Sequence, residues 1–147
     1  MNATKKNWNL LALALIASLS FAGYVQAEEK AQEKETLADH MGVINSAVKK
    51  LRKNVKNADM NKDSIELSNG AAVAAAACIE MTPEIAKKVP AADKDKFIAE
   101  YKKQMGELID SFKSLSKLLM ENKNDDAEAI VTKLLDQKKK GHEQFTE

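Results

Sequence analysis

The chain has 147 residues, and its 23 Lys and Arg residues nearly balance its 22 Asp and Glu residues. A near-neutral chain without a basic patch argues against a nucleic-acid-binding function. Few aromatic residues, only two prolines and many Ala, Lys, Glu and Leu residues favour helices over strands. The length predicts a single folded domain.

Residues 1–27 have the features of a secretory signal peptide. Two lysines precede an apolar run, and the small-x-small pattern Val25-Gln26-Ala27 follows it. The run is too short to span a bilayer comfortably, so we expect cleavage after Ala27 and no membrane insertion afterwards. The domain would then comprise residues 28–147, with a net charge of −1, and would be exported to the periplasm.

Three segments have apolar residues spaced three and four apart, which is the period of an amphipathic helix. These positions are Leu37, Met41, Ile44, Val48, Leu51 and Val55 in the first, and Phe97, Tyr101, Met105, Leu108, Phe112, Leu115 and Leu119 in the second. In the third, Val131, Leu135 and Phe145 have this spacing together with Lys138 and His142.

Another helix is expected between the first two of these segments, from about Asp63 to Glu80, with a cap at Asn61 or Asp63. It is thin, because residues 70–77 are almost all Gly and Ala. The next helix begins near residue 92 or 93, and the last is capped by Asn124 or Asp125. Four helices with short links predict an all-α fold, an antiparallel up-down-up-down four-helix bundle.

Cys78 is the only cysteine, so it has no partner for a disulfide within the chain. Its neighbours in "AAVAAAACIE" indicate a small buried core residue, and an intermolecular disulfide is the alternative.

Met41 and His142 are predicted to face each other at one end of the core, because the first and fourth helices of such a bundle are antiparallel neighbours. A thioether and an imidazole form a known pair of haem axial ligands. Gly42 and Gly141 adjoin them, and each helical Gly costs about 1 kcal/mol relative to Ala. A large flat ligand would explain that cost, with Phe97, Tyr101 and Phe145 as apolar walls and the thin helix leaving room.

Each of these residues also has a simpler interpretation. Met41 fits an ordinary core position, and His142 fits a partly buried histidine with a satisfied hydrogen bond. The two glycines could serve only to let helices pack closely. For a metal-ion site or hydrolytic catalysis the chain has no H-x-x-x-H or C-x-x-C pattern and no nucleophile constellation.

The chain resembles the cytochrome b-562 family of periplasmic four-helix haem proteins. The resemblance rests on "LADHMGVIN", "TPE…KKVP", "KFIAEYKKQMGELID" and "ENKNDDAEAIVTKLLDQKKKGHEQF", and it spans about Leu37 to Phe145. It implies that Met41 and His142 bind haem iron and that Phe97 and Tyr101 line the pocket. Lys138 stands where the family has an arginine, so it keeps a charge for a propionate but lacks the bidentate fork.

A C-terminal arginine of the family falls near Thr146, where a charge is lost, and the third helix is about one turn longer. The related cytochromes c′ have a C-x-x-C-H motif where this chain has residues 138–142 without cysteine, so the haem would be non-covalent haem b. Iron with two axial protein ligands has no open position, which predicts one-electron transfer and no enzyme activity. The alternative is a haem-free periplasmic helical-bundle binding or stress protein. We expect a monomer with a redox partner protein that the sequence does not identify.

Overall fold

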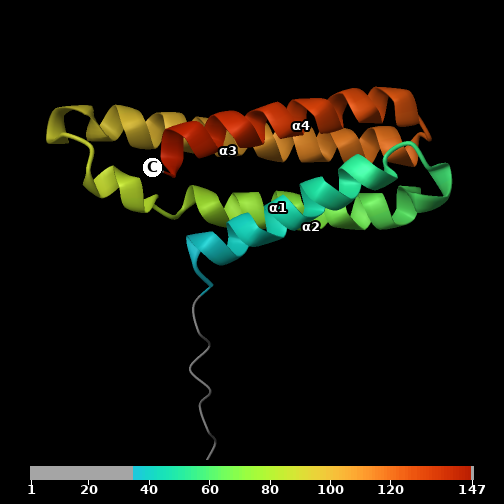
Figure 1. Ribbon diagram of the computed structural model, residues 1–147, viewed down its shortest axis with the longest axis horizontal. Coiled ribbons are helices and arrows are strands. Elements are labelled where there is room, and N and C mark those ends of the chain that lie inside the picture. The colour runs from blue at the N-terminus through green and yellow to red at the C-terminus, as the bar shows by residue number, and fades with distance from the viewer. Residues whose placement is uncertain (1–34, 147) are drawn as a thin grey trace, which may run out of the picture. The chain divides into compact units, whose positions relative to one another are not determined.

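The structure is a computed structural model that describes residues 35–146. The predicted signal peptide and its cleavage site lie outside the described residues. Within them the chain forms four α-helices and two 3₁₀ helices, η1 and η2 (Figure 1). In chain order these are α1 Leu37–Asn54, η1 Ala58–Met60, α2 Asn61–Ile79, η2 Glu84–Lys87, α3 Ala91–Met120 and α4 Asn124–Phe145.

Consecutive helices run in opposite directions, and α4 packs against both α3 and α1 (Figure 1). This arrangement confirms the predicted antiparallel up-down-up-down bundle. The first turns of α1 therefore lie at the same end as the last turns of α4. No strand occurs between residues 35 and 146, and none of the helices there has an apolar stretch long enough to cross a membrane.

The start of α1 is fixed by a capping box. The Thr36 hydroxyl accepts a hydrogen bond from the Asp39 backbone N–H at 3.2 Å, and the Asp39 carboxylate accepts one from the Thr36 backbone N–H at 2.8 Å. Hydrogen bonds from the Thr36 side chain and backbone lower the pKa of Asp39. Met41 thus lies only one turn beyond a well-defined helix end.

The predicted caps of α2 and α4 are wrong. The N-cap residues are Met60 and Lys123, and neither has a side-chain capping bond. Asn61 and Asn124 are instead the first residues of their helices, and their side chains bind each other: the Asn124 amide donates to Asn61 Oδ1 at 2.8 Å. The tertiary contact has overridden the local preference of Asn for a cap.

This amide pair closes the end of the bundle where α3 turns into α4. Asn122 has a φ of 55° in that turn, and the next N–H bonds to the Leu118 carbonyl at 2.9 Å, as in a Schellman motif. The Asn61 amide donates to Leu119 O at 3.3 Å and to Asn122 Oδ1 at 3.0 Å. The Asn124 amide also donates to Val55 O at 2.6 Å, so the α1–α2 and α3–α4 connections share one network.

The helix α2 packs closely against its neighbours. Its buried residues are small: Asn61, Ser64, Ser68, Ala71, Ala74, Ala75 and Cys78. The Ser68 hydroxyl donates to the Phe112 carbonyl of α3 at 2.8 Å, across a tight interface. The small side chains of α2 therefore allow close contact with α3, and no residue of α2 lines the cavity that contains Met41 and His142, contrary to the prediction.

Cys78 is fully buried in this interface, which confirms its predicted place in the core. Burial raises the pKa of its thiol to about 11. The bulkiest fully buried residues come from the other helices and include Leu51, Phe112 and Leu134. The core thus consists of large side chains from α1, α3 and α4 closed by the small face of α2.

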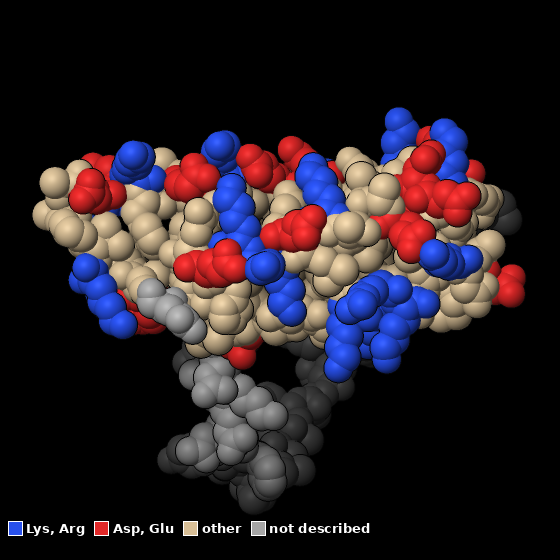
Figure 2. All heavy atoms as spheres, turned by 45° about the horizontal axis from the view of Figure 1, so that its top comes forward, with Lys and Arg blue, Asp and Glu red and all other residues tan. Residues whose placement is uncertain are grey.

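Charged side chains of both signs cover the face shown in Figure 2. They are mostly interspersed, and several Lys and Arg side chains gather in one cluster. Exposed ion pairs such as Lys56 with Glu128, at 2.9 Å, contribute little to stability. The surface therefore keeps the bundle solvated while the apolar core holds it together.

Candidate functional site

A cavity of about 520 Å³ opens at the end of the bundle where α1 begins and α4 ends. It lies between α1, α3, α4 and η2, and no residue of α2 lines it. Its volume falls in the range of about 300–1,000 Å³ that is typical of ligand and cofactor pockets. The apolar walls include Leu37, Met41, Ile44, Tyr101, Met105, Leu108 and Phe145.

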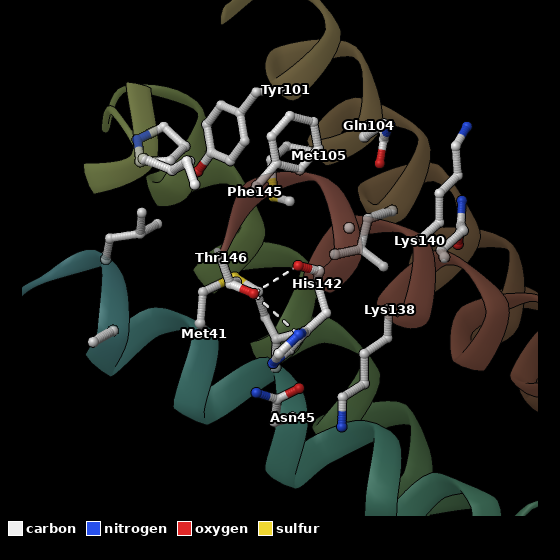
Figure 3. Close-up of a pocket in the computed structure, with 18 of the residues that line it drawn as sticks. Met41, Asn45, Tyr101, Gln104, Met105, Lys138, Lys140, His142, Phe145 and Thr146 are labelled. Atoms are coloured by element: carbon white, nitrogen blue, oxygen red, sulfur yellow. Dashed lines mark hydrogen bonds between the residues drawn. The ribbon is translucent and has the colours of Figure 1, made fainter. Parts of the chain in front are cut away.

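Met41 and His142 both line this cavity, as the bundle topology predicts. Met41 projects from the second turn of α1 and His142 from the last turns of α4, and the two side chains lie toward each other (Figure 3). Met41 is partly buried against the core. The fold therefore brings a thioether and an imidazole together at one opening.

The expectation that His142 faces the core is only partly right, because this side chain is exposed while it lines the cavity. The buried residues of α4 are Ala127, Val131, Leu134 and Phe145. At 3.6 residues per turn these buried positions centre on the side of Leu134 and Phe145, and His142 lies at the edge of that face, next to the cavity. Lys138 is also exposed, and it too lines the cavity.

The imidazole of His142 is in contact with the residue one turn later. Thr146 Oγ1 lies 3.0 Å from His142 Nδ1 and donates a hydrogen bond to the His142 carbonyl at 2.6 Å. Figure 3 shows both interactions at the rim of the cavity. The side chain of Thr146 thus contacts Nδ1 of the His142 ring and does not contact Nε2.

The two glycines beside these residues do not mark close helix contacts. A Cβ at Gly42 would meet no atom within 4 Å, and one at Gly141 would meet only Gln104 Oε1, at 4.0 Å. Both glycines line the cavity. The alternative that they allow tight helix packing is therefore wrong, and both leave open space next to the cavity.

Of the three predicted aromatic wall residues, Tyr101 and Phe145 line the cavity and Phe97 does not. The Phe97 ring packs edge-on against Phe145, with centroids 5.2 Å apart, behind the wall. Tyr101 is buried and its hydroxyl donates to the Cys78 carbonyl at 2.9 Å. Burial, and secondarily Cys78, raises the pKa of Tyr101, so it stays neutral.

Lys138 and Lys140 are exposed at the cavity, and neither is ion-paired to another residue within 35–146. The opening therefore has unpaired positive charge next to an apolar interior. Such a combination suits an amphipathic ligand with an apolar body and acidic groups at its edge.

Sequence reasoning missed several cavity residues. Met105 of α3 is a second thioether in the wall, and the connection before α3 contributes Pro83 and Ile85. Met105 lies one turn after Tyr101 on the predicted apolar face, which was the available signal. The connection has no apolar periodicity that would indicate a cavity wall, because its η2 turn is positioned by tertiary packing, with Ala86 buried.

The cavity and the two convergent side chains are those of a ligand-binding four-helix bundle. Residues 35–146 contain no cluster of three His, Cys, Asp or Glu residues that could hold a metal ion alone. The family model for cytochrome b562 matches residues 36–146, and the chain belongs to this family. Membership indicates a haem-binding electron-transfer cytochrome. No curated protein and no solved structure matched the chain.

Proposed function

We propose that the protein is a periplasmic electron carrier that binds one non-covalent haem b through Met41 and His142. The observation that carries this proposal is that the two side chains reach one cavity from two antiparallel helices, Met41 from the start of α1 and His142 from the end of α4. Family membership supports the haem, and the predicted signal peptide supports the periplasm.

The residues present fit a haem group. The donor pair is a thioether and an imidazole, which is the axial set of cytochromes and raises the reduction potential. The walls are apolar and partly aromatic, and Gly42 and Gly141 leave space for a flat ring beside the backbone. Lys138 and Lys140 would neutralise the propionates at the opening.

The chemistry that haem supplies when bound is one-electron exchange at iron. The task of the protein is to position and enclose the group. Met41 and His142 would occupy both axial positions, so this arrangement leaves no place for a substrate and favours a carrier over an enzyme. Tyr101, held by its bond to the Cys78 carbonyl, and Phe145 exclude water from the interior. We further propose a monomer that exchanges electrons with a partner protein.

Haem titration of the purified domain followed by absorption spectroscopy tests this function. We expect one equivalent to bind and the reduced protein to show resolved low-spin bands. Met41→Leu should abolish the low-spin spectrum, whereas Met105→Leu, a matched thioether in the same wall, should retain it. His142→Gln should weaken binding, whereas His40→Gln, which alters the other histidine, outside the cavity lining, should not.

A low-spin spectrum that survives Met41→Leu but not Met105→Leu would reassign the sulfur ligand to α3. No haem uptake by the wild-type protein at micromolar haem would exclude the electron carrier. The cavity would then belong to a haem-free helical-bundle binding protein.

A further inference from the structure

The hydroxyl of Thr146 lies between two atoms of His142. Its Oγ1 is 2.6 Å from the His142 carbonyl oxygen and 3.0 Å from ring Nδ1. A hydroxyl has one proton to donate and lone pairs to accept with. A carbonyl oxygen only accepts, so the hydroxyl proton is committed to the shorter contact.

The proton count then settles the role of the ring. With its proton on the carbonyl, Thr146 Oγ1 presents only lone pairs to Nδ1. Two lone pairs do not form a hydrogen bond, so Nδ1 must be the donor. In a neutral imidazole with the proton on Nδ1, the lone pair available for a metal is on Nε2.

The helix end holds Thr146 in this place. The residue is one turn after His142, and its backbone N–H also bonds to the His142 carbonyl, at 3.3 Å. Phe145, which directly precedes it, is buried and packs against Tyr101. The last turn is therefore anchored from α3, which limits fraying at Thr146.

We propose that Thr146 is a positioning residue that selects the Nδ1–H tautomer of His142 and so presents Nε2 to the cavity. The consequence for iron rests on the proposed function, but the tautomer is a property of the protein without haem. An acceptor on the distal ring nitrogen orients a metal-binding histidine and raises its basicity, and its loss typically lowers affinity about 10- to 100-fold.

The haem-free protein provides the first test. Long-range ¹H–¹⁵N correlation spectra of ¹⁵N-histidine protein at pH 8 distinguish the two neutral tautomers, and His40→Gln assigns the signals. We expect the Nδ1–H form for His142. Thr146→Val should shift the signals toward a mixture, and Thr146→Ser should restore them. A predominantly Nε2–H ring in the wild type would overturn the proposal, as would an unchanged spectrum in Thr146→Val.

Thr132→Val is the matched control. Thr132 is also exposed on α4 and its hydroxyl donates to the carbonyl four residues earlier, Glu128 O, at 3.1 Å, with no histidine beside it. It therefore reports the effect of losing such a backbone bond alone. We expect this variant to leave the His142 tautomer unchanged, and a shift equal to that of Thr146→Val would overturn the specific role of Thr146.

The haem-loaded protein provides the second test. Thr146→Val should weaken haem binding about tenfold and raise the reduction potential, because a less basic imidazole stabilises ferric iron less. Thr146→Ser should restore both. An Nδ1–H ring in a protein that binds no haem would refute the electron carrier and leave the tautomer selection standing. A haem-binding protein with an Nε2–H ring in its haem-free form would refute the tautomer selection and leave the electron carrier standing.

Discussion

The Phe145 ring packs edge-on against Tyr101, with centroids 5.3 Å apart and an interplanar angle of 77°. Phe97 adds a second edge contact to the same ring, at 71°. These contacts fasten the end of α4 to α3. Since His142 lies one turn before Phe145, the aromatic group also fixes the position of the imidazole.

Replacing Phe145 should therefore affect both stability and haem binding. We expect Phe145→Ala to lower the free energy of unfolding of the haem-free protein by about 3 kcal/mol, the low end for a core Phe, because the residue is in the last turn. Haem affinity should fall as well. Urea unfolding and haem titration measure the two effects, and Phe145→Leu, which keeps most of the apolar volume, should recover part of each. Full stability in Phe145→Ala would show that the contacts do not hold the helix end.

Gly141→Ala should change stability and haem affinity in opposite directions. The added Cβ meets only Gln104 Oε1, at 4.0 Å, so the haem-free protein should gain up to about 1 kcal/mol from helix propensity. The same methyl group would occupy space beside the cavity and weaken haem binding. Gly106→Ala is the control, because a Cβ there meets no atom within 4 Å and Gly106 does not line the cavity. It should raise stability and leave affinity unchanged. Equal haem affinity in the two variants would count against a ligand next to Gly141.

Asn61→Ala should destabilise the bundle without altering the site. The substitution leaves partners of a buried amide unsatisfied and should cost about 1–3 kcal/mol. Its control is Asn57→Ala, which removes an exposed bond to Asp59 N at 3.1 Å and should cost less. Urea midpoints measure both. A large loss of haem affinity in folded Asn61→Ala protein would show that the cavity depends on the amide network at the other end of the bundle, contrary to this prediction.

Cys78 should make stability depend on pH in the alkaline range. Its pKa is about 11 in the fold against 9.0 for an ordinary thiol, so between these values the unfolded chain has lost a proton that the native protein keeps. Stability then falls as pH rises, with a slope approaching about 1.4 kcal/mol per pH unit. Below pH 9 both states are protonated and the contribution disappears.

Urea unfolding at pH 8, 9.5 and 10.5 tests this dependence. The variant Cys78→Ala should show a shallower decline over the same range, whatever its absolute stability. Tyr101, whose pKa is also raised by burial, should add a decline above pH 10 that persists in both proteins. Identical slopes for the wild type and Cys78→Ala would rule out the thiol as the source.

The spacing of apolar residues predicted three of the four helices, and the turn and cap residues around Asp63 to Glu80 predicted the other. Together they were sufficient to predict the helix order and the juxtaposition of Met41 with His142. These features depend on helical periodicity and on the alternation of direction in a bundle with short links. The helix caps could not be predicted, because Asn61 and Asn124 bind each other across the fold, whereas capping rules consider only neighbours in sequence.

The cavity was harder to predict than the fold. Its walls depend on which side of α4 is buried, and His142 lies at the edge of that side, on the exposed rim. Phe97 has the right spacing for a wall residue, yet the Phe145 ring lies against it. The contact between Thr146 and His142 depends on the hydroxyl rotamer in the last turn, which no sequence pattern reports.

The amide network of Asn61, Asn122 and Asn124 closes the end of the bundle opposite the cavity. It holds the helices in register through polar bonds that do not depend on a bound group. Substitutions around the opening can therefore retune the potential, or admit a different guest, while the far end preserves the fold. The bundle is thus a scaffold in which evolution or a designer can alter the binding end by successive single changes without first rebuilding the architecture.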